Sequence, residues 1–310
     1  MSTFRIQVLF PNGVFSYMHI IDLLQVSPTA LMFFTGILGL LFGSFLNVVI
    51  HRLPKMMEQE WGAQCREFLE LGDDEQKKSE HKQYTLVTPR SSCPQCQTPI
   101  AAYDNIPVVS YLLLLGKCRH CKKHIPLRYP IIETVTAILS VIVAWKFGFT
   151  WAMGAALILT WCLIALSMID FDTQLLPDDI TLPLLWLGLG LSLFPIFTDM
   201  QSSIIGAMAG YLSLWSIYHL FRLVTGKEGM GHGDFKLLAV FGAWLGWQCL
   251  PIVILLSSVV GAVVGLSLIV FKGRDKNIPI PFGPYIATAG WIYLIWGTEI
   301  TAAYFQFFAI

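Results

Sequence analysis

Carboxylates at the ends of apolar segments are the residues of this chain with the clearest chemical potential. Five aspartates stand there: Asp170, Asp172, Asp178, Asp179 and Asp234. Ionisable side chains in or beside membrane-spanning segments are energetically costly, so they are functional candidates by default. Two carboxyl groups held a few ångströms apart cannot both ionise cheaply, and one keeps a proton while the other acts as a base. Such a pair can activate water and protonate a leaving amine, which is peptide hydrolysis without a metal ion or a covalent nucleophile.

Structural roles compete with catalysis at these positions. Asp178 or Asp179, ahead of the sequence ITLPLL, is expected to cap or begin a helix, and Asp172 is expected to be a solvated loop residue. Asp234, in the sequence GHGDFK, could equally cap the helix that follows it, but three glycines nearby favour a close approach or a bend of the backbone. These glycines are Gly229, Gly231 and Gly233. The residues alone leave the choice between Asp170, Asp172 and Asp178 open.

A second group with chemical potential consists of four cysteines in two Cys-x-x-Cys pairs. Cys93 and Cys96 form the first pair, and Cys118 and Cys121 follow after 21 intervening residues. Each pair offers two thiolates from one tight turn, and two such pairs complete a tetrahedral zinc site. Because all four ligands are cysteines, no position remains for water, and the zinc is expected to be structural rather than catalytic. A disulfide or a redox role is the alternative.

Other chemical signals in the sequence are weaker. Glu133 begins the second apolar segment in RYPIIE and is either a satisfied interfacial carboxylate or a partner that supports the aspartates. The chain has no Gly-x-x-x-x-Gly-Lys-Ser/Thr phosphate loop, no His-Glu-x-x-His zinc motif and no Gly-x-Ser-x-Gly elbow. GMGHGD is not a dinucleotide fingerprint, because no strand precedes it.

The elements that position these residues are predicted to be membrane-spanning helices. The chain is 55% hydrophobic and only 13% charged, with a mean hydropathy of +0.64, which is typical of an integral membrane protein. Apolar runs long enough to cross a bilayer, or nearly so, recur along it. The 35-residue run 237–271 is too long for one span and is split at Pro251, so eight spans are predicted. They cover residues 30–50, 130–145, 151–169, 180–197, 202–221, 237–250, 251–271 and 284–306.

The lysines and arginines orient these spans. Segments 51–129, 222–236 and 272–276 hold 18 of the 20 basic residues, and eight spans put all three segments on one side of the membrane. By the positive-inside rule that side is the cytoplasm, so both termini face outward. The five aspartates then share the cytoplasmic face, and the cysteines lie in a compartment that disfavours stable disulfides. No removable signal peptide is evident at the N-terminus.

Four segments follow from this topology. They are an outer-face segment (1–29) that lies flat or is unstructured, a first span (30–50), a cytoplasmic insert (51–129) and a seven-helix membrane domain (130–310). Residues 58–80 of the insert have helical apolar spacing and a net charge of −5, typical of a solvated helix and linker, with attraction of a basic peptide as the alternative. Small-residue pairs predict close helix packing: Gly39/Gly43, Gly206/Gly210 and Gly261/Gly265.

Five motifs, in order, resemble those of the type IV prepilin peptidases, which are bacterial inner-membrane aspartic proteases of the Gly-x-Gly-Asp class. The motifs are GSFLNVVIHRLP (43–54), the two Cys-x-x-Cys pairs, RYPIIE, IDFDTQLLPD and GHGDFK. The resemblance covers nearly the whole chain after residue 30. It implies an all-α polytopic membrane protein in which Asp170, the first acid of IDFDTQLLPD, and Asp234 of GHGD form the catalytic pair.

The resemblance also implies substrates and cofactors. Members of the family cut the short basic leader from type IV prepilins and from the pseudopilins of type II secretion, on the cytoplasmic side of the inner membrane. Many members also methylate the new N-terminus with S-adenosylmethionine, and the four-cysteine insert accompanies these bifunctional members. The expected ligands and partners are therefore structural zinc, S-adenosylmethionine, prepilins, pseudopilins and membrane lipid, with no nucleic acid.

Two other functions compete with the peptidase. A proton-coupled transporter would use the acids as a proton relay, but transporters bury ionisable groups near the middle of the bilayer and often contain inverted repeats. Here the acids gather at one face, and no repeat is visible in the sequence. A zinc-dependent scaffold without chemistry would leave the glycine-flanked Asp234 unexplained.

Overall fold

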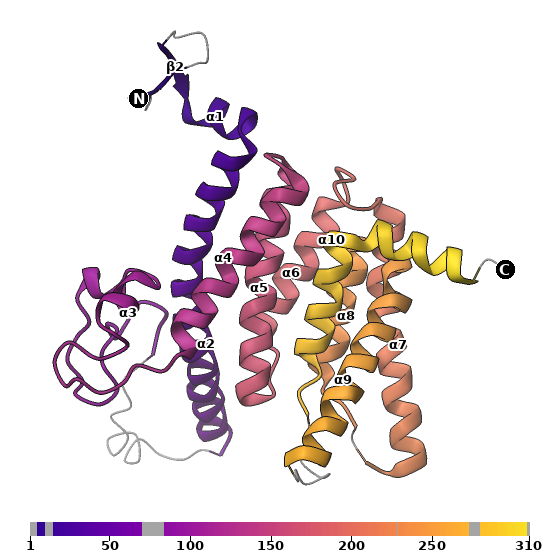
Figure 1. Cartoon of the computed structure of the whole chain (residues 1–310). Helices are drawn as coiled ribbons and strands as arrows, with labels where there is room; N and C mark the ends of the chain where they lie inside the picture. Colours follow the sequence, from indigo (N-terminus) through magenta and orange to yellow (C-terminus); the bar gives the residue numbers. More distant parts are fainter. Residues whose placement is uncertain (1–4, 10–14, 70–83, 228, 273–279, 309–310) are drawn as a thin grey trace. The chain divides into compact units, whose positions relative to one another are not determined.

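The computed structural model of the chain is predominantly helical (Figure 1). It describes residues 5–9, 15–69, 84–227, 229–272 and 280–308. The chain divides into two compact units: the first comprises residues 1–47 and 92–161, and the second comprises residues 48–91 and 162–310. The boundaries fall inside two long helices, α2 (Pro28–Phe68) and α5 (Trp151–Thr173).

The first unit begins with a β-hairpin that the sequence analysis did not predict. Strands β1 (Arg5–Leu9) and β2 (Phe15–His19) pair antiparallel, with Arg5 opposite His19. All other regular elements of the described residues are helices, as the all-α class predicts. In this unit they are α1 (Ile20–Val26), the first part of α2, η2 (Ala102–Asn105), α3 (Val109–Leu113), α4 (Arg128–Phe147) and the first part of α5.

Helix α2 continues well beyond the span expected at residues 30–50, because it is 41 residues long. At about 1.5 Å per residue it measures about 60 Å, twice the hydrocarbon core of a bilayer, so part of it projects from the membrane. The helix predicted from the apolar spacing after residue 58 is confirmed as far as Phe68. Residues 70–80, with most of the acidic charge of this region, lie outside the described residues.

Helices α2 and α4 pack closely through small residues. A Cβ atom on Gly39 would lie 2.7 Å from the Cα atom of Ala137, and one on Gly43 would lie 2.7 Å from the Cα atom of Glu133. Any side chain at these glycines would therefore push the two helices apart. The packing predicted for this glycine pair is confirmed.

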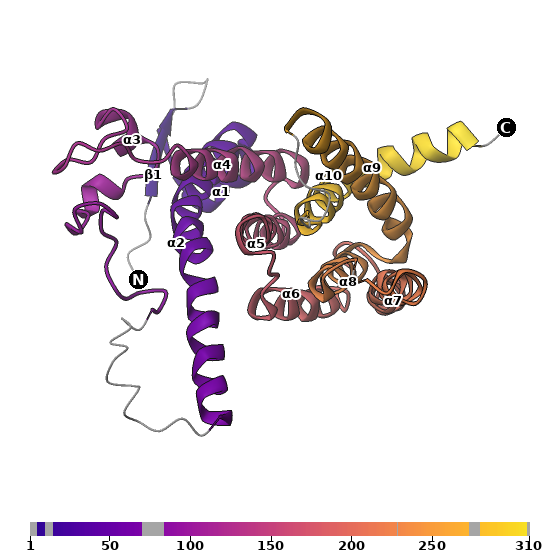
Figure 2. The same ribbon diagram turned by 90° about the horizontal axis from the view of Figure 1, so that it is seen from below.

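The second unit is built around one short helix, α8 (His232–Leu245). Figure 2 shows α8 between α6 (Asp178–Leu191), α7 (Met200–Thr225) and α10 (Gly283–Phe308), and α9 (Leu250–Lys272) also contacts it. A helix that is apolar on every side is stable only when it is buried. Helix α8 illustrates this, because nine of the ten residues from 235 to 244 are apolar or glycine and buried, Lys236 being the exception: Phe235, Leu237, Leu238, Ala239, Val240, Phe241, Gly242, Ala243 and Trp244.

Each of the eight apolar segments found in the sequence corresponds to a helix. Among the described residues, five helical segments are long and apolar enough to cross a membrane: residues 28–68, 128–147, 151–173, 200–225 and 247–268. Helices α6 and α8 have 14 residues each. Their length of about 21 Å is less than the hydrocarbon core of about 30 Å. The chain is thus a helical multi-pass membrane protein, and the number of eight spans stays a prediction.

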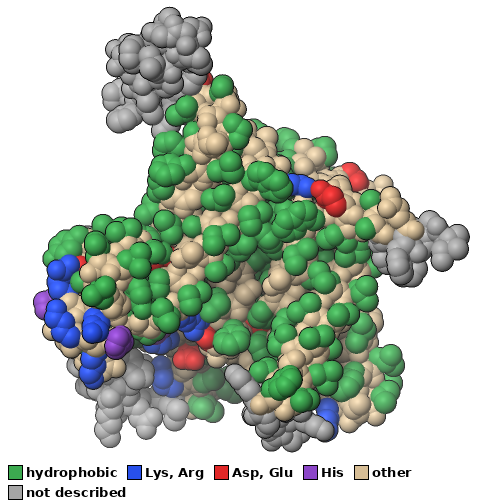
Figure 3. All heavy atoms as spheres, viewed as in Figure 1, with side chains coloured by type: hydrophobic (Ala, Val, Ile, Leu, Met, Phe, Trp, Pro, Cys, Tyr) green, Lys and Arg blue, Asp and Glu red, His purple; other side chains and the backbone are tan. Residues whose placement is uncertain are grey.

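The outward surface of these helices is apolar, as a lipid environment requires. Figure 3 shows hydrophobic side chains over much of the visible face. On α9, five aliphatic side chains are more than half exposed: Leu255, Val259, Val263, Leu266 and Val270. Contiguous exposed apolar surface of this extent is typical of a face that lipid or a partner covers.

The turn between α8 and α9 lies earlier than the sequence analysis predicted. Helix α8 ends at Leu245, Gly246 follows with φ of 82°, and α9 begins at Leu250. Pro251 is therefore in the first turn of α9, where its missing N–H costs nothing. Two helices in this run are confirmed, but the position of the turn at Pro251 was wrong, because glycine accepts a positive φ whereas proline favours a helix start.

Helices α7 and α8 approach so closely that glycines are required at their contact. A Cβ atom on Gly206 would clash with the carbonyl group of Gly242, and one on Gly210 would lie 2.7 Å from the carbonyl oxygen of Leu238. The sequence prediction of close packing at this glycine pair is confirmed.

We predict that Gly206→Ala destabilises the protein by about 1–3 kcal/mol, because α7 must move away from α8 to accept the methyl group. Thermal unfolding of the purified protein in detergent measures this change. Gly190→Ala on α6 is the matched control, since no atom lies within 4 Å of a Cβ atom at that position. Equal melting temperatures for the two variants would contradict the prediction.

Candidate active site and metal centre

The carboxyl group of Asp170 is buried near the C-terminal end of α5, where the residue is 5% exposed. Its Oδ2 atom accepts a hydrogen bond of 2.9 Å from the backbone N–H of Gly283. Gly283 is the first residue of α10, so this carboxyl group meets the positive end of a helix. A buried carboxylate is costly without such a donor, and a backbone N–H at a helix start is well suited to the role.

Asp234 is the third residue of α8 and is 6% exposed. The N-cap of α8 is Gly231, with φ −78° and ψ 147°, and no side chain makes a capping hydrogen bond there. The alternative in which Asp234 caps this helix is therefore wrong. Asp234 instead stands in the first turn, where the helix dipole favours a negative charge.

Both carboxyl groups line one cavity of about 320 Å³. The other walls come from three connections between helices, around residues 174–176, 229–233 and 280–282. The fold thus brings to one cavity two acids that lie 64 positions apart in the sequence.

Two glycines allow the backbone to approach these acids. A Cβ atom on Gly283 would lie 2.6 Å from Oδ2 of Asp170, and one on Gly233 would lie 2.7 Å from the Cβ atom of Leu176. Gly231 differs, because the nearest atom to a Cβ there is Oδ2 of Asp234 at 3.8 Å. Of the two glycines in GHGD, only the second is required by lack of space.

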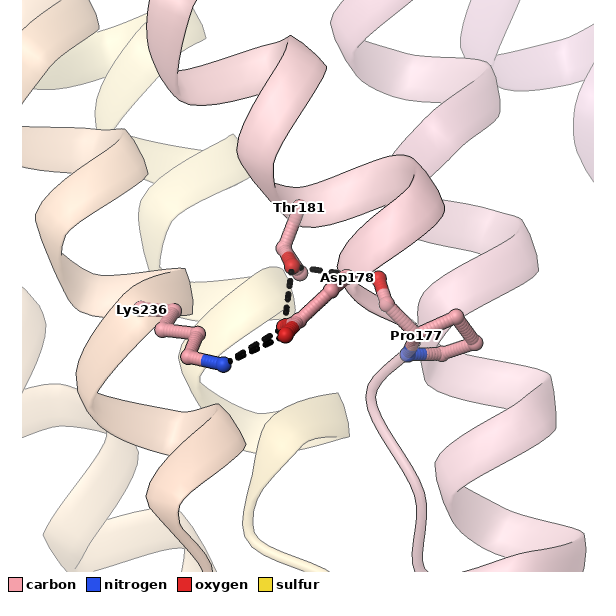
Figure 4. Close-up of polar contacts among 4 residues, drawn as sticks. All are labelled: Pro177, Asp178, Thr181 and Lys236. Atoms are coloured by element: carbon pink, nitrogen blue, oxygen red, sulfur yellow. Dashed lines mark hydrogen bonds and ion pairs between the residues drawn. The ribbon is translucent and has the colours of Figure 1, made fainter. Parts of the chain in front are cut away.

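Asp178 forms an ion pair that joins the first turns of α6 and α8 (Figure 4). The Nζ atom of Lys236 lies 2.6 and 2.7 Å from its two carboxylate oxygens. Thr181 closes the same turn by donating its hydroxyl to the carbonyl oxygen of Pro177 at 3.1 Å. Asp178 is the first residue of α6, as the helix-start interpretation predicted. Partly exposed pairs stabilise proteins by at most about 1 kcal/mol, so this contact serves mainly to align the two helices.

The remaining acidic candidates lie outside the cavity. Asp172 is exposed, as predicted, but it belongs to the last turn of α5 and not to a loop. Asp179 is exposed in the first turn of α6. Glu133, in the first unit, is buried, and its Oε2 atom accepts a hydrogen bond of 2.8 Å from the backbone N–H of Val108. Glu133 is therefore a satisfied carboxylate at the start of α4.

The four cysteines of the Cys-x-x-Cys pairs form a cluster that could hold a metal ion. The Sγ atoms of Cys93, Cys96, Cys118 and Cys121 all lie within 4.8 Å of one another, and those of Cys93 and Cys121 are 3.8 Å apart. Hydrogen bonds from Thr98 lower the pKa of Cys96 to about 6. A thiol with a pKa this low is largely a thiolate at neutral pH, which is the form that binds metals.

The backbone holds the two pairs in the same conformation. The N–H of Gln97 donates to the carbonyl oxygen of Cys93 at 2.8 Å, and the N–H of Lys122 donates to that of Cys118 at 3.0 Å. Gln97 and Lys122 both have positive φ, 55° and 58° respectively. Each pair is therefore one tight turn that presents two thiols, as the spacing predicted.

Gly283 is a site residue that the sequence analysis missed. It lies 113 positions from the aspartate that it contacts, so no local pattern links the two. The signal that could have found it is the sequence PFGPY, because a proline just inside an apolar run predicts a helix start with free N–H groups. Lys236 was likewise counted for its charge and not for its pairing with Asp178.

The fold and the cavity define a class: helical membrane proteins equipped for acid–base chemistry near one end of their helices. Comparison with known families narrows this class. Residues 37–147 match the Bacterial Peptidase A24 N-terminal domain, and residues 157–266 match the Type IV leader peptidase family. The chain belongs to the type IV leader peptidase family, and the resemblance inferred from the five motifs is confirmed.

Relatives named "Prepilin leader peptidase/N-methyltransferase" match nearly the whole chain. The protein of Pseudomonas aeruginosa is 56% identical over 290 residues, which cover 94% of this chain and 99% of the relative. That of Stutzerimonas stutzeri is 54% identical over 287 residues, or 93% and 98%. That of Neisseria gonorrhoeae is 49% identical over 273 residues, or 87% and 92%. No solved structure matches the chain.

We predict that Gly283→Ala and Gly233→Ala each reduce peptidase activity by about tenfold or more, because a displacement of about 1 Å at a reacting group has a cost of this size. Gly231→Ala is the control and should retain most activity, since its methyl group has room. Initial rates of leader cleavage with equal amounts of folded protein measure these effects. If Gly231→Ala were the most damaged of the three, the packing described here would not determine activity.

Proposed function

We propose that the protein is a prepilin peptidase in which Asp170 and Asp234 form the catalytic pair. The observation that carries this proposal is the single cavity into which both buried acids project, within a chain of the leader peptidase family. Membership of this family supports the peptidase and does not support the proton-coupled transporter.

Both acids stand at the start of a helix but are held differently, since Asp170 meets the start of another helix and Asp234 lies in the first turn of its own, and this difference supports different roles. Asp170 accepts the N–H of Gly283 at the start of α10, so its negative charge is compensated. We therefore propose that Asp170 is the base that takes a proton from the attacking water, while Asp234 carries the shared proton. Asp234 then donates its hydrogen bond to the scissile carbonyl oxygen and supports the departure of the amine. Their titration belongs to the pair, since two adjacent carboxyl groups lose their protons in coupled steps.

The proposed substrates are type IV prepilins and type II secretion pseudopilins, because the relatives carry the name prepilin leader peptidase. The proposed location is the bacterial inner membrane, with eight spans, both termini in the periplasm and the cavity at the cytoplasmic face. Supporting this orientation, the cavity-lining residues 229–233 belong to segment 222–236, which is rich in lysine and arginine, and residues 280–282 follow the basic segment 272–276. A substrate helix can then stay in the bilayer while its leader reaches the aspartates.

The proposal includes methylation of the new N-terminus, with S-adenosylmethionine as the methyl donor. Its support is the second half of the relatives' name, N-methyltransferase. No residue of this chain is assigned to the methyl donor.

We further propose that the four cysteines hold a structural zinc ion. Zinc–sulfur bonds of about 2.3 Å in a tetrahedron separate the sulfur atoms by about 3.8 Å, and the Sγ atoms of Cys93 and Cys121 are 3.8 Å apart. The donor set is closed, so the metal would fix the backbone of residues 92–124 and take no part in hydrolysis.

We predict that Asp170→Asn and Asp234→Asn each lower the rate of prepilin cleavage by about 10³-fold or more, since each removes one half of the acid–base pair. Asp172→Asn and Asp178→Asn are matched controls. The first is exposed at the end of α5, and the second breaks a partly exposed ion pair and should change activity less than about fivefold.

Cleavage of a purified prepilin in detergent, with melting temperature as the folding control, measures all four variants. If Asp170→Asn or Asp234→Asn still cut at a rate near that of the unsubstituted enzyme, the assignment of the pair would be wrong.

We predict that the purified protein contains about one zinc ion per chain and that Cys96→Ser lowers this content to well below half. Cys65→Ser is the matched control, because Cys65 is exposed on α2 and lies outside the cluster. Elemental analysis after gel filtration gives the zinc content. Full zinc occupancy in the Cys96→Ser variant would count against the four-cysteine site.

A further inference from the structure

The segment between the two cysteine pairs exposes an unusual amount of apolar surface. Leu112 and Leu113 at the end of α3 are 65% and 79% exposed, and Leu115 in the following loop is 82% exposed. Figure 3 shows this part of the first unit with hydrophobic side chains beside Lys, Arg and His side chains. Leucines cluster on a surface in this way when lipid or another protein covers them.

The depth of α3 relative to the membrane follows from one hydrogen bond to α4. Helix α4 has 20 residues, so it is about 30 Å long and needs its whole length to cross the hydrocarbon core. Glu133 is five residues past its start at Arg128, which is about 7.5 Å along the helix axis. The carboxylate of Glu133 accepts the backbone N–H of Val108 at 2.8 Å. Val108, the residue just before α3, is therefore hydrogen-bonded to a residue that lies about 7.5 Å along α4 from its start.

The other end of the segment, at Gly116, is hydrogen-bonded to a residue that comes just before the start of α4. The N–H of Ile125, three residues before α4, donates to the carbonyl oxygen of Gly116 at 2.8 Å. Helix α3 and its loop are thus tied at one end to Glu133, about 7.5 Å along α4 from its start, and at the other end to Ile125, which comes just before α4. The three exposed leucines lie between these two contacts in the sequence, and the zone between them corresponds to the headgroup and acyl-chain interface of a bilayer that α4 crosses with its whole length.

Basic residues follow the leucines immediately. Lys117, Lys122 and Lys123 are exposed, and Arg119, which is also exposed, pairs with Asp104. Lysines beside an apolar interfacial segment are typical of elements that bind anionic leaflets, where each contributes to attraction of the headgroups.

We propose that α3 and its loop are a membrane anchor of the cysteine cluster. Leu112, Leu113 and Leu115 insert into the leaflet, and Lys117 and Lys122 contact the headgroups of anionic phospholipids. The anchor holds the cysteine-containing segment against the membrane surface from which α4 emerges.

The test places a photo-crosslinking residue, p-benzoylphenylalanine, at position 113 of the full-length protein in lipid nanodiscs. Mass spectrometry then identifies what the residue captures on illumination. Position 69 is the matched control, since Leu69 is also largely exposed, at 62%. It follows the end of α2 and lies about 28 Å along the helix axis from residue 50, where the predicted first span ends. Equal metal content in all preparations shows that the cysteine cluster is intact.

The expected result is a phospholipid adduct at position 113 and none at position 69. The yield at 113 should rise about threefold or more when phosphatidylglycerol is added to phosphatidylcholine nanodiscs. Lys117→Gln combined with Lys122→Gln should remove this rise. Glutamine is tolerated at position 122 because Gln97, at the equivalent position after the first Cys-x-x-Cys pair, is a glutamine with a similar positive φ.

Three results would overturn the proposal. Capture of a second copy of the chain at position 113 would make α3 a protein contact surface. Absence of any adduct at 113 would leave the leucines outside the lipid. A yield that does not depend on anionic lipid would rule out the headgroup contacts of the two lysines.

Discussion

The second unit depends on keeping two carboxyl groups close together and away from water. This arrangement is unfavourable unless the negative charge meets donors that cannot move away, and the start of a helix supplies them. Asp170 receives the N–H of Gly283 at the start of α10, and Asp234 stands in the first turn of α8. Both arrangements require a glycine beside the acid, because a methyl group on Gly283 or Gly233 would overlap atoms of neighbouring side chains. Backbone geometry, more than side-chain chemistry, therefore determines where the acids can stand.

The shortness of α8 follows from the same constraint. A helix that spanned the membrane fully would start at the surface, and its first-turn acid would be solvated. Helix α8 has 14 residues and is enclosed by α6, α7, α9 and α10, so Asp234 is buried although it is only the third residue of the helix. The glycine contacts between α7 and α8 make this enclosure possible, since they let two backbones meet without intervening side chains.

The helices and the cysteine cluster could be predicted from the sequence, whereas contacts between residues far apart in the chain could not. Hydropathy located every long helix, and the spacing of Cys93, Cys96, Cys118 and Cys121 gave the cluster, because period and spacing are local properties. The sequence could not reveal Gly283 as the partner of Asp170, since that contact joins residues 113 positions apart. Nor did it give the pairing of strands β1 and β2, or the turn at Gly246, where a glycine with a positive φ ends a helix inside a continuous apolar run.

The two units use the membrane in opposite ways. In the second unit, exposure of the Asp234 carboxyl group to lipid would be energetically costly, and α8 is surrounded by other helices. In the first unit, the segment that carries the cysteines is too small to bury its own leucines, and a metal ion bound by the cysteines would fix only its turns. Leu113 has no core to enter, but the hydrogen bond between Val108 and Glu133 holds α3 at the depth where acyl chains begin. Lipid at that depth covers the leucines in place of a protein core. The same apolar environment that makes a buried aspartate costly therefore stabilises an exposed leucine.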